Sequence, residues 1–309
     1  MFAGLGLTVV FLAVGSLKGQ DICWKDTVKI IHLQDPCVPG ANRLQWRWSK
    51  ELDYALSCSD FLEVNRRNMK NAHQMTLLQN IKLQTILERP EGFRIRNSFF
   101  HTLGVQFFFD SISKFQFDEN VLDTRFDLKI VNNFSATLSS LVTTRIFDDY
   151  FYSINDSGKQ VRFLQSGFLT PLVWTFSLGF CWNWKGVLDM NFGLSSARLT
   201  YVRDKRVFSS TGQVSFFGVP KDKSALFEYG IFLRLLVDKS FREKVLWKCE
   251  IQLFKNFNTP FDFFIKNSID IRITKYFKTS IQTRMFYEET QSQHLQLENL
   301  ISFGFNFHL

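Results

Sequence analysis

Proline and cysteine are scarce in this chain of 309 residues, which holds six Pro and five Cys, and glycine is not in excess. Because 45% of the residues are hydrophobic, the composition excludes collagen-like, low-complexity and intrinsically disordered chains. The cysteines show no Cys-x-x-Cys spacing, which argues against a metal site. Beyond the N-terminus, charged or polar residues interrupt every apolar run before it reaches the roughly 20 residues of a membrane-spanning helix.

Motifs for enzymatic chemistry are also missing. The sequence has no Walker loop, no dinucleotide fingerprint and no zinc-protease motif. Outer-membrane phospholipases use a His and a Ser in a His-x-Ser arrangement, whereas His101 is followed by Thr102 and Leu103. A nucleophile also needs a base and an orienting group within reach, and no such set is visible. We therefore predict no enzymatic activity, no catalytic residue, no cofactor and no metal ion. The alternative is a lipid-processing outer-membrane enzyme.

Phenylalanine, by contrast, is abundant: the chain has 36 Phe, more than one residue in nine. In the second half of the chain, apolar and polar residues alternate over long runs, which is the period of a β-strand. Phe227, Tyr229 and Ile231 begin one such run. These runs exceed the about 5 to 6 residues of ordinary strands and match the about 9 to 11 residues of a tilted membrane strand. Near Ser195 and Ser196 the alternation changes phase, which predicts a β-bulge.

This pattern predicts an all-β fold, a closed antiparallel up-and-down transmembrane β-barrel of about twelve strands. The expected strands are 51–61, 73–87, 94–110, 115–130, 133–147, 171–183, 186–202, 225–238, 243–255, 260–273, 276–288 and 296–309. Two long irregular stretches, 148–170 and 203–224, fall on one side of the membrane, opposite the short turns that follow even-numbered strands. Strand 51–61 is weakly patterned, so a barrel of ten strands remains an alternative. A soluble secreted β-sandwich binding protein is the alternative to the membrane fold.

Three segments are expected along the chain. Residues 1–19 are predicted to form a signal peptide, because the N-terminal stretch is uncharged and mostly apolar and is followed by small residues. Residues 20–50 are expected to form a periplasmic N-terminal segment, and residues 51–309 the outer-membrane β-barrel. The expected localisation is the bacterial outer membrane.

Charged residues on the polar side of the last five strands are expected to face the barrel lumen. Acids and bases balance there, so we expect a narrow or plugged lumen cross-linked by ion pairs, either as a satisfied polar interior or as a selective path. The predicted lumen-facing charged residues are Glu228, Arg234, Lys248, Glu250, Asp262, Lys266, Asp270, Arg272, Lys278 and Arg284.

The end of the chain is similar to the signal that the outer-membrane assembly machinery reads, with aromatic residues at alternate positions. The predicted signal residues are Phe303, Phe305, Phe307 and Leu309. The net charge of +8 is not accompanied by a basic helix or an RNA-binding motif, so we expect no nucleic acid. The expected partners are outer-membrane lipids and lipopolysaccharide, the assembly machinery and, as one alternative, a protein complex of the envelope.

Five short segments carry a resemblance to a known family. They are Phe168–Pro171, Gly193–Tyr201, Phe227–Gly230, Leu253–Asn256 and Glu298–Phe305. Over residues 95–309 the chain resembles a family of uncharacterised outer-membrane barrel proteins of the Bacteroidota, known only as a domain of unknown function. The resemblance implies a location and a fold but no activity. We therefore predict an integral outer-membrane β-barrel protein, either a narrow channel for small solutes or a structural or accessory component of an envelope complex.

Overall fold

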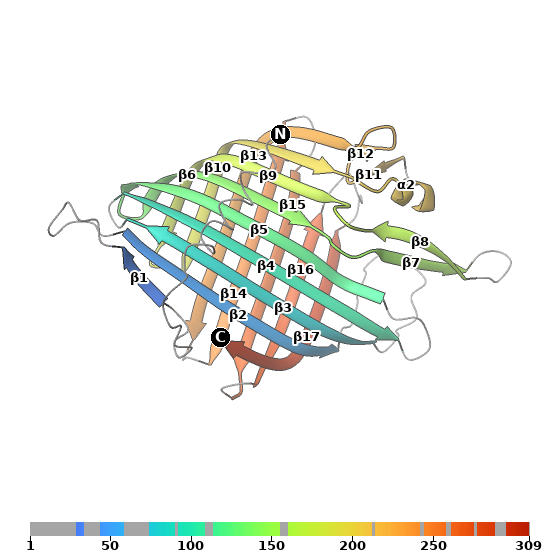
Figure 1. The fold of residues 1–309 in the computed structure, drawn as a ribbon, viewed down its shortest axis with the longest axis horizontal. Coiled ribbons are helices and arrows are strands. Elements are labelled where there is room, and N and C mark those ends of the chain that lie inside the picture. The colour runs from blue at the N-terminus through green and yellow to red at the C-terminus, as the bar shows by residue number, and fades with distance from the viewer. Residues whose placement is uncertain are drawn as a thin grey trace.

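The computed structural model describes residues 29–33, 44–58, 74–89, 92–108, 114–154, 160–211, 214–241, 244–257, 261–274, 277–287 and 295–308. Strands dominate these residues, with one short helix (Figure 1). None of the described helical structure is long and apolar enough to cross a membrane. The strands are β1 (Lys29–Leu33), β2 (Leu44–Cys58), β3 (Gln74–Glu88), β4 (Phe93–Phe108), β5 (Lys114–Val131), β6 (Phe134–Thr144), β7 (Asp149–Ile154), β8 (Gln160–Ser166), β9 (Leu172–Trp184), β10 (Leu188–Tyr201), β11 (Ser215–Phe216), β12 (Val219–Pro220), β13 (Ala225–Phe241), β14 (Val245–Asn256), β15 (Phe261–Arg272), β16 (Phe277–Tyr287) and β17 (Gln296–His308), and the helix is α2 (Arg206–Thr211).

Thirteen of the strands form one antiparallel sheet in the order β1-β2-β17-β16-β15-β14-β13-β10-β9-β6-β5-β4-β3. Apart from two insertions, β7–β8 and α2–β12, strands that follow one another along the chain pair with each other, which is the up-and-down arrangement. β2 also pairs with β3, the strand at the other end of this order. Figure 1 shows β2 to β5 crossing in front of β14 to β16 at a steep angle, so the sheet is strongly curved.

Each of the twelve expected strands coincides with a strand of this sheet, and all except β2 agree with the expected boundaries to within three residues. β2 begins at Leu44, before the expected start at 51. The predicted count of about twelve strands is corrected to thirteen in the sheet, because β1 adds a strand. β17 pairs with β2 only over residues 51–58, and β1 pairs with residues 44–48. β1 thereby satisfies backbone groups of β2 that β17 does not reach.

Side chains of opposite character alternate along the strands and divide the sheet into two faces. On β9, Leu178 is 56% exposed, whereas the neighbouring Ser177 is 1% exposed. The exposed side chains of this strand are Trp174, Phe176, Leu178, Phe180, Trp182 and Trp184. We call this side of the sheet the apolar face and the side with buried polar residues the polar face. Proteins folded in water bury apolar side chains and expose polar ones, so the arrangement is inverted here.

The predicted β-bulge is present in β10. Its register shifts between Gly193 and Ser195 against β9, and between Gly193 and Ser196 against β13. Gly179 on β9 lies opposite Gly193, and a Cβ atom on Gly179 would come within 1.9 Å of the Phe192 carbonyl oxygen. The two backbones therefore approach so closely that only glycine fits at position 179.

Gly179→Ala is expected to destabilise the sheet by about 1–3 kcal/mol, because the added methyl group meets backbone atoms of β10 rather than a movable side chain. The measurement is the thermal unfolding midpoint followed by circular dichroism in detergent. Gly92→Ala is the matched control, since its nearest contact would be the flexible side chain of Arg89 at 3.4 Å. Equal midpoints for the two variants would contradict the close approach of β9 and β10.

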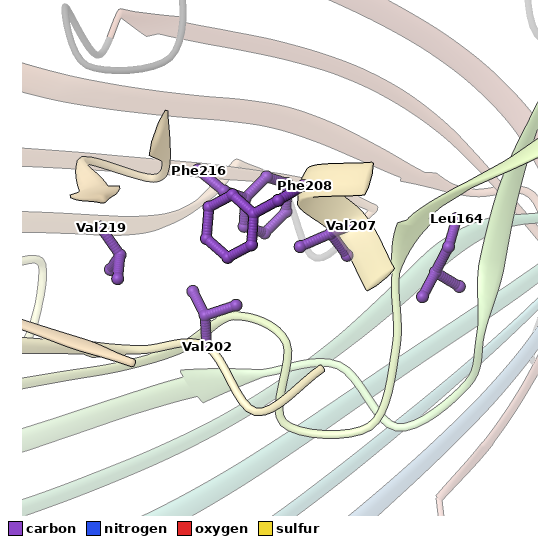
Figure 2. Packing of buried hydrophobic residues seen from close by; sticks show 6 residues of the cluster. All are labelled: Leu164, Val202, Val207, Phe208, Phe216 and Val219. Carbon is purple, nitrogen blue, oxygen red and sulfur yellow. The ribbon is translucent and has the colours of Figure 1, made fainter. Parts of the chain in front are cut away.

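The expectation that residues 148–170 and 203–224 are irregular is wrong. β7 and β8 form a hairpin between β6 and β9, and α2, β11 and β12 lie between β10 and β13. Apolar side chains from both segments and from Val202, directly before the second, share one buried core, shown in Figure 2: Leu164, Val202, Val207, Phe208, Phe216 and Val219. We call the two segments together the cap, and Figure 1 places it beyond one end of the strands. Most of this core comes from the segment that holds α2, β11 and β12, and Leu164 of β8 packs against it, so the two segments are held together.

Phe208→Ala is expected to open the cap without unfolding the sheet. The Phe208 side chain is 1% exposed, and removing a ring of this size from a core costs about 3–5 kcal/mol. Limited proteolysis should then cut within residues 203–224, while the circular dichroism of the strands stays unchanged. Val214→Ala is the control, since Val214 is 84% exposed. Unchanged protease resistance of the Phe208 variant would show that this core does not hold the cap together.

Candidate functional site: the polar face of the sheet

The polar face carries buried acids and bases from strands distant in the sequence. A charge removed from water is costly unless it is paired, so the partners decide whether this face is stable. The buried charged residues of this face in the described part of the chain are Asp123, Arg125, Asp127, Asp189, Glu228 and Arg234.

Arg125 on β5 and Asp189 on β10 form a two-pronged ion pair. Arg125 Nη1 donates to Asp189 Oδ1 at 2.8 Å, and Nη2 donates to Oδ2 at 2.6 Å. Arg96 on β4 adds a third donor, with Nη2 at 3.2 Å from Asp189 Oδ2. β6 and β9 lie between β5 and β10 in the sheet, so on a flat sheet the paired strands would be about 14 Å apart. The ion pair therefore requires the sheet to curve towards its polar face.

Two further arginines connect strands that are not neighbours. Arg234 on β13 donates from Nη1 to Asp123 Oδ2 on β5 at 2.6 Å, and from Nε to Glu250 Oε1 on β14 at 2.8 Å. Three strands lie between β13 and β5. Arg284 on β16 places Nη2 at 3.7 Å from Glu119 Oε2 on β5, although several strands separate β16 from β5 in either direction. These contacts cross the space that the curved sheet surrounds.

Arg198 on β10 forms a third group of ion pairs. Its Nε donates to Glu228 Oε2 at 2.8 Å, and its Nη2 donates to Asp262 Oδ2 at 2.6 Å. The guanidinium also lies over the ring of Phe254, 4.2 Å from the ring centroid. Asn256 Nδ2 donates to the remaining oxygen of Glu228, Oε1, at 2.9 Å. Each of these buried groups thus has a partner of matching chemistry.

The ten charged residues expected to face the lumen all lie in β13, β14, β15 and β16. Glu228 and Arg234 are buried, and Arg272 is exposed at the end of β15. The half-buried residues among the ten are Lys248, Glu250, Asp262, Lys266, Asp270, Lys278 and Arg284. The structure brings Arg234 together with Glu250, and Lys248 Nζ to 3.8 Å from Asp270 Oδ2.

Eight charged residues of the ion-pair network lie in β4, β5 and β10 and were not predicted from the sequence. The missed charged residues are Arg94, Arg96, Glu119, Asp123, Arg125, Asp127, Asp189 and Arg198. The signal for them was present in β5, where Asp123, Arg125 and Asp127 occupy alternate positions. Applying the period of two to this strand would have placed all three on one face.

The residues expected to form the assembly signal are only partly described. Phe303 is 48% exposed on the apolar face of β17. The backbone of Phe305 lies opposite Tyr54, and that of Phe307 opposite Leu52. The side chains of Phe305 and Phe307, and the whole of Leu309, lie outside the described residues. The assembly signal therefore stays a prediction.

His101, one of the histidines weighed as catalytic candidates, belongs to a polar cluster at the base of the cap. Another of them, His294, lies outside the described residues. Its Nδ1 lies 2.7 Å from Asn120 Oδ1, and Asn120 Nδ2 donates to Asp118 Oδ1 at 3.0 Å. The other oxygen of Asp118 accepts the backbone N–H groups of Ile146 and Phe147. The cluster therefore fastens the start of the cap to β5. Within the described ranges, no Ser or Thr hydroxyl bonds to the His101 ring, and no group of three or more His, Cys, Asp or Glu could hold a metal ion.

Comparisons with known proteins give likenesses at the level of architecture. No protein-family model matches the chain, and no curated protein matches it. The translocator domain of the autotransporter NalP from Neisseria meningitidis is 8% identical, with 88% of this chain and 90% of that chain covered and a TM-score of 0.36. The NanC porin is 8% identical over 83% of this chain and 100% of that chain, with a TM-score of 0.38. For the KdgM porin in complex with disordered oligogalacturonate, the identity is 11%, the coverage 84% and 99%, and the TM-score 0.32. Because these identities and TM-scores are low, the function has to be argued from the residues of the chain itself.

Asp189→Asn is expected to destabilise the protein by about 3–5 kcal/mol, because it removes the shared carboxylate and leaves Arg125 and Arg96 under-neutralised. The measurement is the urea midpoint of unfolding in detergent. Asp222→Asn is the matched control, since Asp222 is exposed in the cap. If both variants unfold at the same urea concentration as the natural chain, the ion pair has no structural role.

Proposed function

We propose that this chain is an integral outer-membrane β-barrel protein. The observation that carries the proposal is the inverted sheet, whose outward side chains are apolar and whose buried side chains are polar. An apolar surface of this extent is unfavourable in water and favourable against lipid tails. Its exposed residues come from strands all along the sheet and include Leu83, Leu122, Leu138, Leu178, Leu194, Ile269, Ile281 and Ile301.

The sheet closes into a barrel in the membrane. Hydrocarbon offers no hydrogen bonds to backbone groups, so a membrane-spanning sheet must leave no unpaired edge. Support comes from β2, which pairs with β3 on one edge and with β17 on the other. The ladder from β2 through β3, β4 and onwards to β17 is then continuous. Strands of eleven residues or more in this ladder are long enough for a tilted membrane strand of about 9 to 11 residues.

The cap lies on the outer side of the membrane and the short turns on the periplasmic side. Residues 132–133 join β5 to β6, and residues 185–187 join β9 to β10. The cap segments follow β6 and β10, so they lie at the opposite end of the strands from these turns. Barrels of the outer membrane have short periplasmic turns and longer outer loops. A signal peptide in residues 1–19 and insertion by the assembly machinery belong to this proposal, with outer-membrane lipids and lipopolysaccharide as the surroundings.

Ion pairs restrict the lumen to a narrow path. The Arg125–Asp189 and Arg234–Asp123 contacts both cross it, and the side chains of Leu141, Phe232 and Phe254 pack together inside it. The protein is therefore a narrow channel for small solutes or, if no path remains, a structural component of an envelope complex. Enzymatic activity is not part of the proposal.

The first test is carbonate washing of the membrane fraction followed by electrophoresis of boiled and unboiled samples. We expect the protein to stay in the membrane and to migrate differently after boiling, because a closed barrel resists the detergent until it is heated. Release by carbonate with identical migration would contradict the barrel. Single-channel recording in planar bilayers then separates the two versions. Small, steady conductance steps support the channel, and the absence of channel events leaves the structural role.

A further inference from the structure

Lys266, in the middle of β15, differs from the arginines of the polar face because it forms no ion pair with a described side chain. Arg125, Arg198 and Arg234 each donate to carboxylates at 2.6 to 2.8 Å. The Lys266 amine, by contrast, has no hydrogen bond or ion pair with any side chain in the part of the chain that the structure describes. The residue is half-buried on the polar face. The carboxylates of Glu119 and Glu250 attract this charge from beyond ion-pair distance, whereas Arg284 and Lys248 repel it.

The nearest charged positions add to this positive charge. Lys266 lies directly opposite Arg284 on β16, and like charges in directly opposed positions destabilise a sheet. Lys248 on β14 is opposite Ser268, which places it diagonally from Lys266, about 7–8 Å away. Three cations from three adjacent strands therefore gather on one stretch of the polar face.

The acids that face this stretch already have other partners. Glu250, directly opposite Lys266, accepts hydrogen bonds from Arg234 at 2.8 Å and from Gln252 at 2.7 Å. Asp270 accepts from Ser280 Oγ at 2.5 Å and lies 3.8 Å from Lys248. Glu119 faces Arg284 at 3.7 Å, and Asp262 accepts from Arg198. The carboxylates around Lys266 are thus held away from its amine by arginines of β10, β13 and β16 and by Lys248.

We propose that this stretch of β14, β15 and β16 is an anion-binding site centred on the Lys266 amine, with Lys248 and Arg284 beside it. The ligand is an oxyanion group of a small solute, a carboxylate or a phosphate. An ammonium group offers three donors, and cationic side chains in a pore wall select anions. The inference rests on the proposed function, because only a water-accessible lumen would admit such a solute.

The first experiment measures the site itself and needs no conductance. Folded protein in detergent is treated briefly with a small amine-acetylating reagent, and the modification of each lysine is quantified by mass spectrometry. Inorganic phosphate is expected to slow acetylation of Lys266 several-fold and to leave Lys255 unchanged, since Lys255 lies exposed on the neighbouring strand. The same measurement is made with acetate: protection by both anions indicates a general anion site, and protection by phosphate alone indicates a phosphate site. Equal rates with and without both anions would overturn the proposal, and so would failure of the reagent to reach Lys266.

The second experiment measures ion preference in planar bilayers under a potassium chloride gradient. Lys266→Gln is expected to shift the reversal potential towards cations, whereas Lys266→Arg keeps the charge and the preference. Lys255→Gln is the matched control for loss of one positive charge. If channels open and Lys266→Gln does not change their reversal potential, the anion site is overturned, whereas the proposal of a barrel still holds. If no channels form, the transport version of the function fails, and the acetylation result decides the site by itself.

Discussion

In the proposed membrane location, backbone N–H and C=O groups that face hydrocarbon have no water to bind, and this constraint governs the fold. It favours a spanning sheet without open edges, and the pairing of β2 with both β3 and β17 joins the two ends of the ladder that runs from β2 to β17. Because the strands surround a space, side chains on one face must share that space. The guanidinium groups of Arg125, Arg198 and Arg234 pair there with carboxylates, whereas the outward positions are free to be apolar. Inverted burial is the arrangement expected of a sheet whose outer face meets lipid, as proposed.

Arginine is the residue that makes the enclosed space stable. Its planar guanidinium binds two oxygens at fixed geometry, and its length lets it reach strands that do not pair with its own. Arg234 joins β13 to both β5 and β14, and Arg198 joins β10 to β13 and β15. Lysine supplies one compact charge without that fork, and in this sheet Lys266 lacks a carboxylate partner among the described residues.

The sequence predicted the strands well because their signal is local. A period of two sustained over long runs locates β9, β13 and β17 without knowledge of their neighbours, and the phase change near Ser195 locates the bulge. What the sequence did not reveal depends on contacts between distant segments. The partners Arg125 and Asp189 lie 64 positions apart, and only the curvature of the sheet brings them together. The core of the cap could not be predicted from the sequence for the same reason, since Leu164 and Phe208 come from different insertions.

The shared edge of β2 has a bearing on how copies of this protein can meet. A strand edge with unpaired backbone groups is a template on which another molecule can add a strand. β17 covers residues 51–58 of that edge and β1 covers residues 44–48, so within the described stretch only Ser49 and Lys50 lack a paired residue there. The seam where the chain's beginning meets its end is therefore blocked against strand exchange. The open edge of the described sheet is the side of β1 that faces away from β2, and it is five residues long. Copies that associate in a membrane would therefore meet mainly through outward side chains, by packing aromatic and aliphatic surfaces.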